Sequence, residues 1–259
     1  MTGAIVPQIS DREQIRIRLE RNRPWTAYAL ADLEPGYFEK TAWFCDAGGL
    51  GLTLLYRGFS RPLIFCIENP DHPESILDEI ESIVGGSDRY LVSGPENLPA
   101  IRRRYHVLDE RPMNRMTLDA RHFRPAPGGS VARLGPDHLG QLNALYDEGP
   151  PEFFSDSMLT EGIYFGLFEG AGLVAVAGTH IVSHTYSIGA LGNIYTRADR
   201  RSRGYCTQVT SVLSDYLLKA GITTLVLNVR ENNDAAIRVY GRLGYRAFCR
   251  YFELAAAHR

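Results

Sequence analysis

The chain has 259 residues, of which 44% are hydrophobic, 10% aromatic and 22% charged. This length exceeds the usual single domain of roughly 100–200 residues, and the composition is that of a globular protein with a full core. A disordered, collagenous or disulfide-scaffold protein is therefore excluded. The net charge of −2 argues against a nucleic-acid-binding face, which carries an excess of Lys and Arg.

The spacing of the cysteines and the length of the apolar runs indicate the compartment in which the protein works. The four cysteines are widely spaced and form no C-x-x-C pair, so we expect a reducing cytoplasm and no metal. The first residues lack the basic and apolar regions of a signal peptide, and no run of 18 apolar residues occurs. We therefore expect a cytoplasmic monomer or homodimer with no nucleic-acid or membrane partner.

A segment rich in Pro and Gly, residues 124–130, predicts a boundary between a domain at 1–124 and a domain at 125–259. Before it, β-enriched runs predict strands and apolar spacing predicts helices. The expected elements are helices at 11–22, 24–32, 73–84 and 96–104, and strands at 41–46, 51–57, 62–68, 89–93 and 112–119.

The second half repeats this order of elements. We expect a strand at 130–134, helices at 137–147 and 155–161, strands at 163–168, 172–182 and 187–196, a helix at 205–220, a strand at 222–229, a helix at 234–242 and a strand at 246–254. Two halves with one element order predict a duplicated α/β unit.

A basic turn follows the strand that ends at Thr196, and Gly204 stands where the next helix begins. The free N–H groups and the dipole of a helix N-terminus favour an anion, and Arg200, Arg201 and Arg203 would add charged donors. An ordinary solvated turn is the alternative. Neither a Walker loop nor G-x-G-x-x-G is present, which argues against a nucleotide triphosphatase or a Rossmann domain.

A second motif lies downstream. Asn233 is a predicted N-cap, Tyr240 follows on the short helix, and Gly244-Tyr245 closes it. With Arg201-Ser-Arg-Gly-Tyr-Cys206, this pattern resembles the GNAT superfamily of N-acetyltransferases, although Cys206 replaces a small residue of the acetyl-CoA loop. The resemblance covers about residues 130–254. It is nearest to the glycine N-acyltransferase-like branch.

The resemblance implies a mixed α/β fold with two GNAT-like domains in tandem, each a twisted mixed sheet flanked by helices. It implies that acetyl-CoA, as co-substrate, lies between two splayed strands, with its pyrophosphate on the amides of residues 201–207. Tyr240 would be the general acid that protonates the leaving thiolate. The implied cofactor-binding residues are Ile194, Tyr195, Thr196, Arg201, Ser202, Arg203, Gly204, Tyr205, Cys206, Thr207, Asn228, Asn233, Ala236 and Tyr240.

The general base is not evident, because the strand at 187–196 has no acidic residue where many relatives place a Glu. The candidates are His180, His184 and Glu152. On a regular strand, His180 and His184 would share one face, but their spacing alone does not indicate a metal site. Structural roles for both histidines, and a solvated loop position for Glu152, are the alternatives.

The first half lacks the basic loop. The corresponding segment, residues 68–74, carries three acids and two prolines, which repel phosphate and remove N–H donors. We therefore expect a degenerate GNAT-like domain that does not bind CoA but shapes the acceptor pocket. Its aromatic residues would line that pocket or fill the core: Trp25, Tyr28, Tyr37, Phe38, Trp43 and Phe44.

These observations predict an acyl-CoA-dependent N-acyltransferase that transfers acetyl to a primary amine of a small molecule. The amine would attack the thioester directly in a ternary complex, since no cysteine is suitably placed for a covalent intermediate. Two alternatives stay open. One is acetylation of a protein lysine or N-terminus, and the other is a non-catalytic acyl-CoA-binding regulator.

Overall fold

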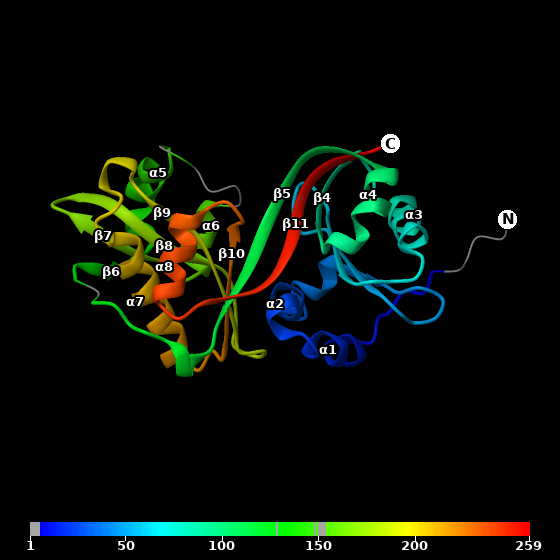
Figure 1. The fold of residues 1–259 in the computed structure, drawn as a ribbon, viewed down its shortest axis with the longest axis horizontal. Coiled ribbons are helices and arrows are strands. Elements are labelled where there is room, and N and C mark those ends of the chain that lie inside the picture. The colour runs from blue at the N-terminus through cyan, green and yellow to red at the C-terminus, as the bar shows by residue number, and fades with distance from the viewer. Residues whose placement is uncertain (1–5, 128, 148, 150–153) are drawn as a thin grey trace. The chain divides into compact units, whose positions relative to one another are not determined.

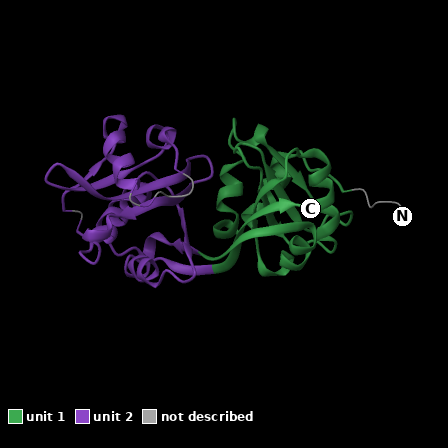
Figure 2. Cartoon of the chain, turned by 90° about the horizontal axis from the view of Figure 1, so that it is seen from above, with its two compact units in different colours: residues 1–114, 249–259 green, residues 115–248 purple. Residues whose placement is uncertain are grey.

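A computed structural model describes residues 6–127, 129–147, 149 and 154–259 (Figure 1). The chain divides into two compact units, one formed by residues 1–114 and 249–259 and the other by residues 115–248 (Figure 2). No helix in the described ranges is long and apolar enough to cross a membrane.

The first unit contains two helices, a three-stranded meander and then two helix–strand pairs. Its elements are α1 (Arg12–Glu20), α2 (Arg23–Ala31), β1 (Thr41–Phe44), β2 (Leu52–Tyr56), β3 (Leu63–Glu68), α3 (Pro73–Ile83), β4 (Asp88–Ser93), α4 (Leu98–Arg104) and the start of β5 (Tyr105–Leu118). Short 3-10 turns lie at Phe38–Lys40 and Pro95–Asn97.

The second unit has the same order of elements after one short extra strand. They are β6 (Val131–Arg133), α5 (Leu139–Tyr146), α6 (Asp156–Glu161), β7 (Phe165–Glu169), β8 (Gly172–Ser183), β9 (Ile188–Thr196), α7 (Tyr205–Lys219), β10 (Thr224–Arg230), α8 (Asp234–Arg242) and the start of β11 (Arg246–His258). Short 3-10 turns lie at Ala120–His122, Pro136–His138 and Ala198–Arg200.

Strand pairing is repeated as well as element order. In the first unit, β1–β2 and β2–β3 are antiparallel and β3–β4 is parallel. In the second, β7–β8 and β8–β9 are antiparallel and β9–β10 is parallel. The predicted mixed α/β fold, with mixed strand pairing and flanking helices, is therefore confirmed, although the strands are joined in one 11-stranded sheet and not in two separate sheets.

Two long strands pass from one unit to the other. The order in the first unit is β1-β2-β3-β4-β11-β5, and in the second it is β5-β10-β9-β8-β7-β6. β11 therefore lies beside β4, in an antiparallel register that joins Phe252 to Ser93. The boundary between the units lies within β5 and β11, and not at the predicted residue 124. Each of these strands is continuous, with 14 residues in β5 and 13 in β11, and contributes residues to both units.

Each unit has its own core. In the first, apolar residues of β3 and β4 pack with α3 and α4, and Phe252 and Leu254 of β11 complete the cluster. In the second, α7 packs on β8, β9 and β10 through Val209, Leu213 and Leu217. A smaller cluster beneath α5 and α6 contains Tyr146 and Tyr164.

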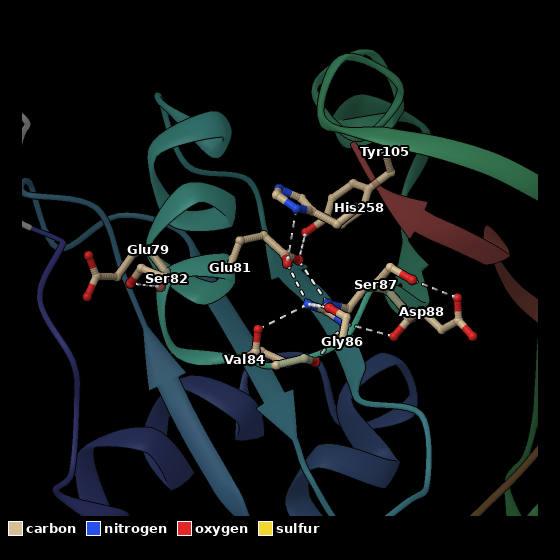
Figure 3. A network of polar contacts seen from close by, with 11 residues as sticks. Glu79, Glu81, Ser82, Val84, Gly86, Ser87, Asp88, Tyr105 and His258 are labelled. Carbon is tan, nitrogen blue, oxygen red and sulfur yellow. Dashed lines mark hydrogen bonds and ion pairs between the residues drawn. The ribbon is translucent and has the colours of Figure 1, made fainter.

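A buried ion pair closes the C-terminal end of α3 (Figure 3). Arg89 is 1% exposed, and its Nη2 lies 2.6 Å from Oε2 of Glu81. The guanidinium also donates to the carbonyls of Asp88, at 2.9 Å, and Gly86, at 3.0 Å. The Tyr105 hydroxyl donates to Glu81 at 2.6 Å. These charges are therefore held by several hydrogen bonds inside the first unit, as a buried pair requires.

Candidate functional site

β9 and β10 are paired only over part of their length. Their register joins residues 188–191 to residues 224–227, although β9 continues to Thr196 and β10 to Arg230. The structure describes this whole region, so the strands separate after Leu191 and Leu227. The expected cofactor-binding residues Ile194, Tyr195, Thr196 and Asn228 all lie in these separated ends.

Thr196 marks the end of this opening. Its Oγ1 is buried and has no hydrogen-bond partner among the described residues. A buried polar atom without a partner is costly, and a ligand that offers a donor or an acceptor would remove that cost. The end of β9 is therefore suited to a polar chain that lies between the two strands.

The turn between β9 and α7 leaves the first helical amides uncapped. Gly204 is the N-cap residue, with φ of 83°, and it has no side chain to cap the helix. Ser202, two residues earlier, also has a left-handed φ of 63°. The first N–H groups of a helix have no partner inside it. This turn therefore presents the amides of Tyr205, Cys206 and Thr207 to an anion.

Glu169 at the end of β7 engages two of the three arginines of the turn. Arg200 Nε donates to its Oε2 at 2.7 Å, and Arg203 Nη1 lies 3.6 Å from Oε1. The Tyr205 hydroxyl also donates to Glu169. The hydrogen bonds from Tyr205 and then Arg200 lower the pKa of this carboxyl.

The sequence analysis expected Arg200, Arg201 and Arg203 all to donate to an anion, whereas in the structure Arg200 and Arg203 contact Glu169. Arg201 is not engaged by Glu169 and donates from Nε to the Thr196 carbonyl at 3.2 Å. Glu169 was missed because it lies outside the motif and carries no local signal. Its contact with Tyr205 spans 36 positions of the sequence.

α8 brings the second motif to the same region. Asn233 is its N-cap, as predicted, and its Oδ1 accepts from the Ala236 amide at 3.1 Å. Tyr240 is 6% exposed, and its hydroxyl makes no hydrogen bond within the described part of the chain. Burial raises the pKa of Tyr240 well above its usual value, and the nearby Cys206 thiol adds to that effect. Tyr240 therefore keeps its proton at neutral pH.

Cys206 occupies the position of a small residue in the motif. Burial raises the pKa of its thiol to about 11. The nucleophilic form of a cysteine is the thiolate, so this thiol is a poor nucleophile near neutral pH. The structure thus gives Cys206 a packing role beside Tyr240.

The structure separates the base candidates. His180 lies on β8, half-buried, with Nε2 3.2 Å from Oδ1 of Asn193 on β9. His184 is exposed in the turn after β8 ends at Ser183. The expected shared strand face is therefore wrong, because a bulge at His180 breaks the alternation and the strand stops before His184. Glu152 lies outside the described residues.

The corresponding loop of the first unit is filled by its own side chains. Glu68 pairs with Arg18, whose Nη2 also donates to the Gly51 carbonyl at 2.7 Å. Asp46 Oδ2 accepts from the Asp71 amide at 3.1 Å. α3 begins at Pro73, which has no N–H, and no side chain caps its N-cap residue His72. The loop before α3 therefore carries carboxylates and a proline where the loop before α7 carries arginines and Gly204.

The aromatic residues of the first unit fall mainly in its core. Trp25, Trp43 and Phe44 are 8%, 2% and 0% exposed. Trp25 donates from Nε1 to the Ile67 carbonyl at 2.8 Å and packs on Phe65. Of this group, Tyr37 is the most exposed, at 38%. Trp25, Trp43 and Phe44 therefore belong to the core of the first unit and do not line an acceptor pocket.

A protein family and a bacterial relative match the part of the chain that contains the two motifs or resemble it in sequence. Residues 164–252 match the family described as FR47-like protein. This range runs from the start of β7 into β11 and contains both motifs. The chain also resembles the uncharacterized N-acetyltransferase YobR of Bacillus subtilis, with 28% identity over 82 residues. That match spans 32% of each chain.

Solved structures extend the likeness to both units. A GCN5-related N-acetyltransferase from Sphaerobacter thermophilus matches with a TM-score of 0.63 and 14% identity, covering 99% of this chain and 96% of its own. A tandem GNAT protein from the clavulanic acid biosynthesis pathway matches with a TM-score of 0.58 and 12% identity, covering 98% of both chains. The chain thus has the fold of tandem GNAT proteins. Among the described residues, no group of three or more His, Cys, Asp or Glu could hold a metal ion.

Proposed function

We propose that this protein transfers the acetyl group of acetyl-CoA to a primary amine of a small molecule. The observation that carries the proposal is the uncapped N-terminus of α7, directly after the separated end of β9 and beside Tyr240. An anion-binding turn, an opening between strands and a proton donor in one place suit a CoA thioester. The placement in the glycine N-acyltransferase-like branch stays a prediction.

The parts of acetyl-CoA are assigned to different residues of the second unit. The pyrophosphate lies on the amides of residues 201–207, which include Ser202 and Arg203. The pantetheine arm follows the backbone of Ile194 and Thr196 along the open edge of β9, with Tyr195 between them. Asn228, Asn233 and Ala236 border the arm from β10 and α8. The buried Thr196 Oγ1, which has no partner among the described residues, supports this path because an amide of the arm would satisfy it.

The reaction is a direct displacement at the thioester carbonyl. The amine nitrogen, after losing a proton to a base, forms a C–N bond as the C–S bond breaks. The thiolate that leaves takes the proton of the Tyr240 hydroxyl. Burial keeps the Tyr240 hydroxyl protonated at neutral pH, so a proton is present at this position when the thiolate forms.

The protein's place in the cell is part of the same proposal. Cys45, Cys66, Cys206 and Cys249 are all free thiols in the structure. Free thiols are typical of proteins that work in a reducing compartment, so we infer that the enzyme acts in the cytoplasm.

Two measurements test this function. Acetyl-CoA at about 100 times its dissociation constant should stabilise the protein by roughly 2.7 kcal/mol, which a thermal shift detects. Release of free thiol over a panel of small amines and lysine peptides then measures transfer. Tyr240→Phe should lower kcat at least tenfold and leave acetyl-CoA binding unchanged. A thermal shift without transfer to any acceptor would instead indicate an acyl-CoA-binding regulator, and transfer to peptides alone would indicate a protein acetyltransferase.

A further inference from the structure

β9 contains a bulge just beyond its paired segment with β10. That segment ends at Leu191. Between Gly192 and Tyr195, which both pair with β8, two residues of β9 stand against a single residue of β8. These two residues are Asn193 and Ile194. A bulge bends the strand that carries it and increases its twist, so β9 changes direction at the point where it leaves β10.

Asn193, the first residue of the bulge, has a left-handed backbone with φ of 53°. Within the described ranges, the other non-glycine residues with a left-handed φ are Ser187 and Ser202, and both lie in turns. Asn193 instead lies inside a strand. Glycine is the usual residue for a left-handed bulge position, and asparagine is one of the few others that tolerate it. The residue type at 193 therefore suits the bend of β9.

Contacts from three other segments of the second unit hold Asn193 in this conformation. The Tyr146 hydroxyl, at the end of α5, donates to the Asn193 carbonyl at 2.6 Å. The Asn193 Nδ2 donates to the Tyr164 hydroxyl at 2.7 Å, and Oδ1 lies 3.2 Å from Nε2 of His180 on β8. Asn193 is 5% exposed. The carbonyl and both side-chain polar atoms of this buried residue are thus hydrogen-bonded in the bulged backbone.

Tyr146 contacts β9 both at the bulge and just after it. Burial raises the pKa of the Tyr146 hydroxyl, so this group keeps its proton at neutral pH and can donate to the Asn193 carbonyl. The Tyr146 ring also packs against the ring of Tyr195, with the centroids 6.3 Å apart. The end of α5 is therefore fixed to the part of β9 that has separated from β10.

We propose that Asn193 positions β9 for acetyl-CoA, because its left-handed backbone, held by Tyr146, keeps the residues that follow it away from β10. This inference rests on the proposed function, in which the pantetheine arm follows the backbone of Ile194 and Thr196. Asn193 acts through that backbone and is therefore a positioning residue. An extended residue at 193 would let β9 continue beside β10, and the opening between the strands would be lost.

Two substitutions separate the backbone of Asn193 from its side chain. Asn193→Gly and Asn193→Val both remove the side-chain hydrogen bonds, but only glycine adopts a left-handed backbone without a steric cost. The acetyl-CoA dissociation constant, measured by calorimetry, should stay within about threefold of the wild type in Asn193→Gly. It should rise roughly tenfold or more in Asn193→Val, because a β-branched residue strongly disfavours this backbone. Tyr146→Phe, which removes the donor to the carbonyl, should have an intermediate effect.

ADP is the control ligand, because it has a pyrophosphate but no pantetheine arm. Its dissociation constant should be the same in the wild type, Asn193→Gly and Asn193→Val, whereas a general disturbance of the second unit would raise it together with that of acetyl-CoA. Equal losses of acetyl-CoA affinity in the two variants, no loss in either, or a matching loss for ADP would overturn this proposal alone. If the wild type does not bind acetyl-CoA, the proposed function fails, and this proposal fails with it.

Crystal structures of the two variants test the backbone without any ligand. The pairing of β9 with β10 should end at Leu191 in Asn193→Gly, as in the wild type, and extend beyond Leu191 in Asn193→Val. If Asn193→Val does not fold, Asn193→Ala takes its place, since alanine also disfavours a left-handed backbone. A bulge that persists unchanged in the folded variant would contradict the role of Asn193.

Discussion

The N-termini of α3 and α7 have the same place in the two units but opposite surroundings. Both helices follow the third strand of a meander and precede a strand parallel to it. At α3, Pro73 removes one N–H, and Glu68 and Asp46 stand before the helix. At α7, Gly204 leaves the amides open. The comparison teaches that two units with one element order can differ in the residues of a single turn, and the proposed function makes that turn decisive for anion binding.

The largest effect on the free energy of unfolding is expected in the first unit, where Arg89 and Glu81 form a buried ion pair. Arg89→Met would leave the buried Glu81 carboxylate with Tyr105 as its main donor. Losing one partner of a buried ion pair costs about 3–5 kcal/mol of unfolding free energy. Urea unfolding measures this loss, and acetyl-CoA binding by the folded variant should be unchanged.

A paired variant sharpens that result. Glu81→Leu combined with Arg89→Met removes both charges and should recover part of the lost stability, because no buried charge is then left alone. A loss below about 1 kcal/mol for Arg89→Met alone would mean that Glu81 gains another donor or becomes protonated.

The second effect is on the open turn. Gly204→Asp places a carboxylate before the α7 amides and a side chain at φ of 83°. We expect the dissociation constant for acetyl-CoA to rise at least 100-fold, or about 2.8 kcal/mol, by calorimetry. His72→Asp, at the N-cap of α3, is the matched control and should leave binding unchanged. Equal losses in both variants would contradict the assignment of acetyl-CoA to α7.

A smaller effect on acetyl-CoA affinity is expected from Glu169, the carboxylate that contacts the arginines of the turn before α7. Glu169→Gln removes the anionic partner of Arg203 and one of the two anionic partners of Arg200, which also pairs with Asp199. We expect acetyl-CoA to bind a few times more tightly and its affinity to fall more steeply with salt, because exposed charges are screened. Titrations at two salt concentrations measure both. Weaker binding would show instead that Glu169 is needed to hold the turn in shape.

The smallest effect is expected at Cys206. Its thiol has a pKa raised by burial to about 11, so it is neutral at the pH of an ordinary assay. Cys206→Ala restores a small residue of the motif, and we expect kcat and acetyl-CoA binding to stay within twofold. Trapping of an acyl-enzyme by mass spectrometry in the wild type, absent in Cys206→Ala, would contradict direct attack.

Local features of the fold were predictable from the sequence. α7 ends before Gly221, which has φ of 83°, and Asn233 caps α8, since both positions carry residues with strong terminal preferences. The turn at Gly204 was found for the same reason. Each of these signals lies within a few residues of the structure that it specifies.

Features that depend on distant partners were not predictable in this way. Asn193 falls inside the strand expected at 187–196, and nothing in the local sequence indicates its left-handed backbone, which lies at an irregularity in the pairing with β8. The contact between Glu169 and Arg200 joins positions 31 apart. β5 begins at Tyr105, although the sequence analysis expected a strand only from residue 112. Charged residues interrupt the apolar alternation in this part of β5, which pairs with strands distant in the sequence.

The place of β11 beside β4 has a consequence during synthesis of the protein. Residues 88–93 lie beside residues 252–257 in the finished sheet. A ribosome that has translated the whole first half has therefore made a unit that still lacks a strand. Until residues 252–257 emerge, the β4 edge has unpaired backbone groups, which are a template for wrong pairing. The first unit, although most of its residues are made first, therefore cannot complete its sheet until after the residues of the second unit have been made.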